Sequence, residues 1–410
     1  MKLPRATLAV ALGSAVSLAA QALFSLVMLR WFTPQAVGTF SVVGQIAFFW
    51  MTLALAQSPL TLLADAHVPA RQALRSALAA SLRRMLWLAP AVVAAVAWSR
   101  LPSPAWALAW AGGLALLQGG WYLAQPYALR TRSPQAAALA KAAPPVTALA
   151  VATLAALAWP DEPVAGLLCA ALAGYAAGAL WLLPPRRAAR AGPAPEAARG
   201  TEGPVAVPAG TQRDGRSIRL RLAHTAVDAL TGAGLLIVWQ RTHGAADAGY
   251  LAVLLRLLGF VPVVVHASWA QVLLAGGSGQ AGSPLRVGLA GAVATLALGA
   301  AGAGALYAGL APSWQAALPY VAPLALWQAA ACVHAACSHL PFQQGRATAF
   351  SRTAIAVALL QWALLALPAW WPGAPIAAVA HAWCLGAASA AALLAWALWM
   401  AGLGKRGGQT

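Results

Sequence analysis

The chain has 410 residues, of which 61% are hydrophobic and only 8% are charged, whereas soluble domains carry about 25% charged residues. No soluble fold of this size can bury so much apolar surface, so the composition excludes a water-soluble enzyme and a soluble nucleic-acid-binding protein. The formal net charge of +18 is concentrated between the apolar runs, which is typical of a membrane protein oriented by its loops.

Twelve apolar runs follow one another along the chain. A bilayer core about 30 Å thick needs roughly 20 apolar residues per helix, and most runs reach this length. They span residues 6–29, 39–63, 84–98, 105–129, 135–159, 164–183, 222–240, 249–275, 285–310, 316–340, 351–371 and 375–401. The third run is short. The fifth contains Pro144 and Pro145, which a membrane helix tolerates because neighbouring helices satisfy the freed backbone groups. We predict an all-α integral membrane protein with about 12 transmembrane helices.

The first run has an alternative interpretation as a cleaved signal peptide, because residues 19–22 are mostly small. The apolar region of a signal peptide has only about 7–15 residues. This run continues to residue 29 and is followed at once by another span. A first membrane helix is therefore the expectation.

The basic residues lie mainly on one side of the predicted membrane. With the N-terminus in the cytoplasm, 22 of the 26 lysines and arginines fall in cytoplasmic ends and loops, and eight of these are arginines between residues 186 and 221. The opposite loops hold three, Arg30, Arg100 and Arg241. Cytoplasmic loops of membrane proteins carry such an excess. The pattern predicts an even number of spans with both termini in the cytoplasm.

The longest segment between runs, residues 184–221, divides the spans into six and six. It is rich in Pro, Gly, Ala and Arg and has no apolar period, which indicates a flexible cytoplasmic linker. It separates an N-terminal lobe of residues 1–183 from a C-terminal lobe of residues 222–410.

The two halves also match weakly at an offset of 211 residues. This offset places Arg30 on Arg241 and Gly38 on Gly249. Because six is an even number, both halves would insert the same way up, as two parallel six-helix lobes with a substrate path between them.

The tenth run contains two cysteines and two histidines, which are side chains that commonly bind metal ions. At about 100° per residue, however, Cys332 and His339 share one helix face while His334 and Cys337 lie nearly opposite. We therefore expect no metal site. The chain also lacks paired carboxylates, a nucleophile triad and the Gly-x4-Gly-Lys-Ser/Thr phosphate loop, and its predicted outer loops are short. We expect neither an enzyme, hence no catalytic residues, nor a cofactor.

Three stretches resemble one family of membrane proteins. Residues 26–49 contain an Arg-x-hydrophobic-Thr-Pro turn and a Gly-aromatic entry to the next span, residues 317–354 contain a Gln-x-Gly-Arg turn, and residues 367–394 contain a Pro…Gly-Ala…Ala-Ala entry to the last span. With the 6+6 layout, the chain looks like the multidrug/oligosaccharidyl-lipid/polysaccharide exporter (MOP) superfamily. The likeness is greatest to its polysaccharide transporter, or O-antigen flippase-like, branch.

The resemblance implies alternating access by two lobes in a bacterial inner membrane, without use of ATP. It implies a polyprenyl-pyrophosphate-linked oligosaccharide as cargo, and a polysaccharide polymerase and glycosyltransferases as partners besides the membrane lipids. We expect no nucleic-acid partner. The first half has almost no ionisable residue deep in a span. This scarcity keeps open a non-transporting membrane scaffold of a polysaccharide-assembly complex. A multidrug or small-solute antiporter is the other alternative, although such exporters usually carry a coupling carboxylate.

Ionisable groups inside a bilayer are costly, which makes each one a functional candidate. Asp228 lies about two turns into the seventh run, and His224 precedes it by four residues, so both share one helix face. They are predicted to form a proton- or cation-responsive pair that faces the cavity. A structural Asp–His hydrogen bond near the cytoplasmic interface is the alternative.

Arg256 lies inside the eighth run and offers a rigid donor fork suited to phosphate. It is predicted to contact the pyrophosphate of the lipid carrier; pairing with Asp228 and snorkelling to outer headgroups are the alternatives. Arg30 and Arg241 occupy equivalent turns of the two halves. They are candidate substrate contacts, although anchoring to lipid headgroups also explains them.

Overall fold

A computed structural model describes most of the chain and consists of helices and short connections. The described residues are 5–64, 67–131, 134–182, 215–274, 283–370 and 376–407, and they include no β-strand. The greater part of the predicted linker 184–221 lies outside the described residues. The helix that follows it already begins at Gly215.

The described residues of the N-terminal half form seven helices. They are α1 (Arg5–Trp31), α2 (Pro34–Leu55), α3 (Ser58–Ala64), α4 (Ala70–Trp98), α5 (Pro104–Thr131), α6 (Pro134–Ala158) and α7 (Pro163–Leu182). The start of α2 carries two local signals, a proline at its first position and an N-cap, Thr33, whose side-chain oxygen accepts a hydrogen bond from the backbone N–H of Ala36 at 3.3 Å. The proline pair of the fifth predicted run lies inside α6 without interrupting it.

The second predicted run is divided into α2 and α3, and an arginine stabilises the break. The Arg84 guanidinium of α4 donates hydrogen bonds to the carbonyl oxygens of Ala54 (2.8 Å) and Leu55 (3.1 Å) and to the hydroxyl of Ser58 (3.1 Å). The last carbonyls of a helix have no partner within the helix, so a cation placed there satisfies them and complements the helix dipole. The apolar character of residues 39–63 masks this break, although Ser58-Pro59 at the start of α3 is a local signal for it, because proline is favoured in the first turn of a helix.

The C-terminal half has the same plan with more interruptions. Its elements are α8 (Gly215–His243), α9 (Ala245–Leu258), α10 (Phe260–Leu274), α11 (Pro284–Tyr307), the 3-10 helix η3 (Pro312–Ala317), α12 (Leu318–Cys337), α13 (Leu340–Gln343), α14 (Ala347–Leu365), α15 (Leu367–Trp370) and α16 (Ala378–Gly407). Only Gly259 separates α9 from α10, which together form the eighth predicted span.

The predicted fold class is confirmed. Among the described residues, ten helical segments are long and apolar enough to cross a membrane. Two further long helices, α5 with 28 residues and α8 with 29, complete the expected twelve. The third run, which looks short in sequence, is a full helix of 29 residues in α4 whose first half carries arginines. Large apolar side chains such as Leu86 and Trp87, 76% and 81% exposed, cover its outer surface, as expected for contact with lipid.

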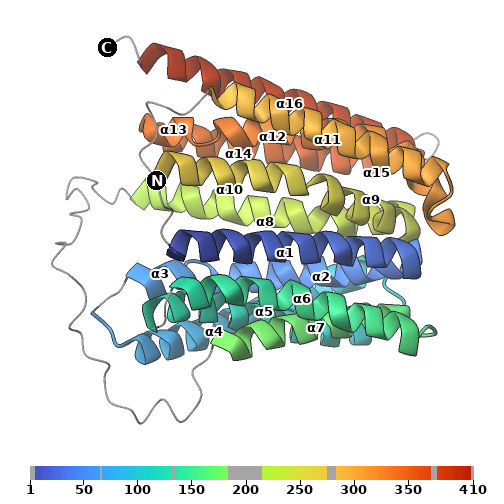
Figure 1. The fold of residues 1–410 in the computed structure, drawn as a ribbon, viewed down its shortest axis with the longest axis horizontal. Helices are drawn as coiled ribbons and strands as arrows, with labels where there is room; N and C mark the ends of the chain where they lie inside the picture. The colour runs from blue at the N-terminus through green and yellow to red at the C-terminus, as the bar shows by residue number, and fades with distance from the viewer. Residues whose placement is uncertain are drawn as a thin grey trace.

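The helices form two groups that lie side by side (Figure 1). Helices α1–α7 contact mainly each other and form the N-terminal lobe, and α8–α16 likewise form the C-terminal lobe. The lobes meet chiefly where α2 contacts α8 and α9. The start of α1, the end of α7, the start of α8 and the end of α16 share one end of the molecule, which we call the linker end. The opposite end, with the connections α1–α2, α4–α5 and α8–α9, is the loop end.

Candidate functional site

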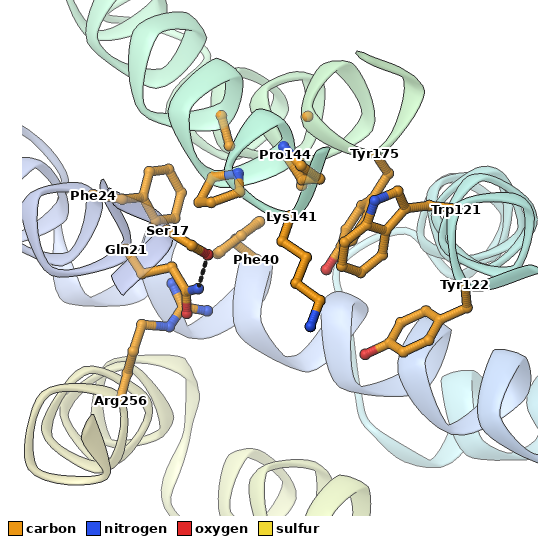
Figure 2. A pocket seen from close by; sticks show the side chains of 14 residues that line it. Ser17, Gln21, Phe24, Phe40, Trp121, Tyr122, Lys141, Pro144, Tyr175 and Arg256 are labelled. Atoms are coloured by element: carbon orange, nitrogen blue, oxygen red, sulfur yellow. Dashed lines mark hydrogen bonds between the residues drawn. The ribbon is translucent and has the colours of Figure 1, made fainter. Parts of the chain in front are cut away.

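Two cavities flank Arg256 of α9. The first has a volume of about 330 Å³ and is lined mainly by α1, α5, α6 and α7 of the N-terminal lobe; we call it the N-lobe cavity (Figure 2). The second, of about 400 Å³, lies between the lobes and is lined by α2, α5, α7, α8 and α9; we call it the inter-lobe cavity. They share four lining residues, Phe40, Ala171, Tyr175 and Arg256. Arg256 therefore faces both spaces.

The Arg256 guanidinium lies against a thioether sulfur and two aromatic rings. It lies 5.7 Å from the ring centre of Phe24 and 6.0 Å from that of Phe40, and its Nη1 is 3.7 Å from the sulfur of Met28. It lies eleven positions after the first residue of α9, which places it about 16 Å from the loop end along the helix axis. The described residues that line the two cavities include no Asp or Glu. The predicted alternative of a pair with Asp228 is not observed among the described side chains, and the mid-span depth argues against snorkelling.

Lys141 of α6 is a second cation at this site, and the sequence analysis missed its location. Its side chain is exposed in the N-lobe cavity, and its ammonium lies between Arg256 and Tyr122 (Figure 2). In the sequence it looks like one of many cytoplasmic charges that set orientation. The one available signal was its depth, because the predicted fifth run already begins at residue 135, nearly two turns earlier.

The remaining lining of the cavities combines aromatic and neutral polar side chains with small and aliphatic ones. Trp121 and Tyr122 come from α5, and Tyr175 comes from α7. The side chain of Gln21 on α1 donates a hydrogen bond to the hydroxyl of Ser17 at 3.2 Å. The site thus combines two cations, hydroxyl and amide groups and three large rings, which suits an anionic ligand with many hydroxyl groups.

The predicted pair His224 and Asp228 lies elsewhere on α8. Neither residue lines the two cavities. The His224 ring packs against Phe350 at 6.0 Å, Asp228 is exposed, and no hydrogen bond joins the two among the described side chains. Their shared helix face is as predicted, and their role in proton or cation coupling stays a prediction.

Arg30 and Arg241 lie at the loop end, in the last turns of α1 and α8. The Arg241 guanidinium lies 5.9 Å above the ring of Trp98. Arg30 is exposed and borders an apolar groove of about 340 Å³ formed with α9, α11 and η3. The structure does not bring these two arginines together with Arg256. Each lies in the last turn of the first long helix of its half, in keeping with the offset of 211 that relates them.

The cysteines and histidines of α12 have separate surroundings. The Cys332 sulfur lies 3.3 Å from the hydroxyl of Thr295, whereas the His334 ring packs on Trp396 at 4.3 Å. Within the described ranges, no group of three His, Cys, Asp or Glu side chains is placed to hold a metal ion.

The loop end is sealed by contacts between the lobes. A Cβ atom built on Gly38 of α2 would overlap the carbonyl oxygen of Ala245, and one built on Gly249 of α9 would overlap that of Pro34. These residues are related in pairs by the offset of 211, so the contact is reciprocal, as expected for two repeats that meet at a twofold axis. The Trp314 indole N–H also donates to the Phe32 carbonyl oxygen at 3.1 Å.

A second polar contact lies beside this crossing. The Gln240 amide of α8 donates to the Ser99 carbonyl oxygen of the N-terminal lobe at 3.4 Å. The reciprocal glycine crossing and these two hydrogen bonds form what we call the loop-end seal. It closes the end of the molecule nearest to Arg256.

Comparison with known proteins identifies the fold. No protein-family model matches the chain, and no curated protein matches it. Among solved structures, the chain is similar to the inward-facing conformation of a multidrug resistance MATE family transporter of the MOP superfamily, with a TM-score of 0.51 and 10% identity over 95% of this chain and 96% of that one. A MATE protein crystallised in complex with MaL6 aligns with a TM-score of 0.45 and 12% identity, over 98% of this chain and 93% of that one. The chain has the fold of the first of these transporters.

Proposed function

We propose that this chain, with the fold of a transporter of the MOP superfamily, exports a lipid-linked oligosaccharide by alternating access. The cargo is a polyprenyl-pyrophosphate-linked saccharide, and its charged head occupies the cavities around Arg256 while its tail stays in the bilayer. In this proposal the linker end faces the cytoplasm, as the distribution of basic residues indicates. The membrane is the bacterial inner membrane, and both termini are cytoplasmic.

The sign of the charge at the site carries the proposal. Arg256 and Lys141 both face the N-lobe cavity, and the described lining residues include no carboxylate to neutralise them. A cation inside a membrane protein costs about 3 kcal/mol or more unless a partner compensates it. A phosphate-bearing ligand supplies that partner, and the planar guanidinium can bind two of its oxygens at once.

Transport then follows from the placement of the site and of the seal. With the loop end closed, cargo enters from the linker end, and the guanidinium and ammonium orient its diphosphate. Parting of α2 from α9 at the loop-end seal would release the head to the other side. The likeness to an inward-facing transporter supports this assignment of the closed end.

The positive charge of the cavity lining also distinguishes the proposed function from its alternatives. A cavity lined by Arg256 and Lys141 repels organic cations, so a cationic drug is a poor ligand, although an anionic small solute is not excluded by charge. A scaffold without transport has no use for an uncompensated cation facing an open space. The described lining residues include hydroxyl groups and the Lys141 ammonium but no His, Asp or Glu beside them that would activate a nucleophile, so they do not favour an enzyme.

A deletion strain tests the proposal. Loss of the chain should cause lipid-linked repeat units to accumulate in the cytoplasmic leaflet, and wild-type protein should restore export. Arg256→Gln should fail to restore it, whereas Arg352→Gln, a change at an exposed residue of α14 outside both cavities, should restore it fully. Unchanged levels of lipid-linked units in the deletion strain, together with new sensitivity to toxic small molecules, would favour the antiporter instead.

A further inference from the structure

We infer that Trp121, Tyr122 and Tyr175 form a subsite for the first sugar ring of the cargo. This inference rests on the proposed function. The three rings form one wall of the N-lobe cavity (Figure 2). The ring centres of Trp121 and Tyr122 are 5.0 Å apart, and those of Trp121 and Tyr175 are 5.7 Å apart. The face of an aromatic ring carries partial negative charge. The positively polarised C–H bonds on one face of a pyranose therefore pack well on it.

The position of the wall relative to the cations supports this subsite. Lys141 lies between Arg256 on one side and the aromatic wall on the other (Figure 2). A diphosphate that bridges the guanidinium and the ammonium would leave its sugar-bearing oxygen toward the rings. The chemical order of the cargo, lipid, diphosphate and then sugar, therefore matches the order of the groups across the cavity.

The neutral polar groups beside the wall supply partners for sugar hydroxyls. Gln118 of α5 is only 6% exposed, lines the adjoining inter-lobe cavity, and its side-chain carbonyl oxygen has no hydrogen-bond partner among the described residues. A buried acceptor without a donor destabilises the protein because it has lost its hydrogen bonds to water. A ligand hydroxyl would satisfy it, whereas a purely hydrocarbon ligand would not.

The members of the wall differ in how much they also support the fold. A Cβ atom on Gly178 would stand 2.7 Å from the Trp121 ring, so Trp121 is packed tightly against α7. Tyr122 is 37% exposed, with its hydroxyl end in the cavity. Tyr122 is therefore the residue at which sugar binding and folding can be tested separately.

Binding of two kinds of probe to the full chain in lipid nanodiscs tests the inference. One probe is farnesyl diphosphate, and the others carry glucose, galactose, mannose or N-acetylglucosamine on the terminal phosphate. At least one glycosylated probe should bind wild-type protein more tightly than farnesyl diphosphate. Tyr122→Ala should weaken that probe about three- to tenfold, leave farnesyl diphosphate unchanged and keep the wild-type melting temperature. Tyr122→Phe should behave as wild type.

The other outcomes discriminate between the two proposals. If no sugar improves binding to wild type, or if Tyr122→Ala leaves the preferred sugar probe unaffected or weakens all probes equally, the sugar subsite is wrong while an anion site remains. If no probe binds wild type, or if Arg256→Gln binds them all as well as wild type, the proposed function itself fails. If Tyr122→Ala melts at a lower temperature than wild type, Tyr175→Ala is measured in its place with the same probes and the same criteria.

Discussion

A single methyl group at the loop-end seal should shift the transporter away from the closed state. In Gly38→Ala the new Cβ atom would overlap the Ala245 carbonyl oxygen and stand 2.9 Å from both the carbonyl carbon of Ala245 and the nitrogen of Gly249. Both partners are backbone, so neither can rotate away, and α2 must separate from α9. Overpacking of this kind costs about 1–3 kcal/mol. The helix-forming advantage of alanine over glycine acts in both states and cancels.

This cost converts directly into a population shift. A change of about 1–3 kcal/mol alters the ratio of closed to open states by roughly 5–150-fold. Because the contact is reciprocal, Gly249→Ala should act in the same direction with similar size. Gly304→Ala on α11 is the matched control, since no atom lies within 4 Å of its added Cβ.

Distances between spin labels measure the shift. Nitroxides at Ser103, in the connection between α4 and α5, and at Ser313 of η3 report the separation of the lobes at the loop end, because both positions are exposed. Native cysteines are replaced by alanine beforehand. Gly38→Ala should populate longer distances, while Gly304→Ala should match wild type. Identical distance distributions in all three proteins would refute the assignment of the glycine crossing as a seal.

Three further substitutions have defined outcomes. Trp314→Phe keeps the ring but loses the hydrogen bond across the lobes, so the same spin labels should show a smaller shift, of about 1 kcal/mol; no shift would mean that the bond does not contribute. Arg84→Ala leaves the last carbonyls of α2 unpaired and should lower thermal stability by about 1–3 kcal/mol, whereas the exposed Arg83→Ala should not, and equal melting temperatures would contradict the capping role. Lys141→Gln should weaken farnesyl diphosphate binding about tenfold with no effect from Arg352→Gln; equal affinity in both would remove Lys141 from the site.

The sequence was most informative about features that depend on the local order of residues and not on tertiary packing. Membrane crossing depends on local apolar length, and the twelve spans follow from it. An isolated charge inside an apolar run is visible without any tertiary information, which is why Arg256 was predicted. The offset that pairs Gly38 with Gly249 also came from the sequence, although their mutual contact did not.

The remainder depended on how helices rotate and cross. Helices α5, α6 and α7 are apolar on nearly all sides, so their periodicity does not indicate which face lines a cavity. Lys141 and the aromatic wall converge only through the packing of these three helices. Arg84 was similarly hidden, because a guanidinium that caps a distant helix looks in sequence like any cytoplasmic charge.

The chemistry of the loop-end seal has a consequence for how the state of this protein responds to its surroundings. Its glycine crossing and its two hydrogen bonds join uncharged groups. Dissolved ions screen exposed charges over about 8–10 Å at ordinary ionic strength but barely affect neutral, tightly packed contacts. The balance between the two conformations should therefore hold steady from dilute buffer to concentrated brine, even where electrolyte weakens the attraction of the cargo's phosphates.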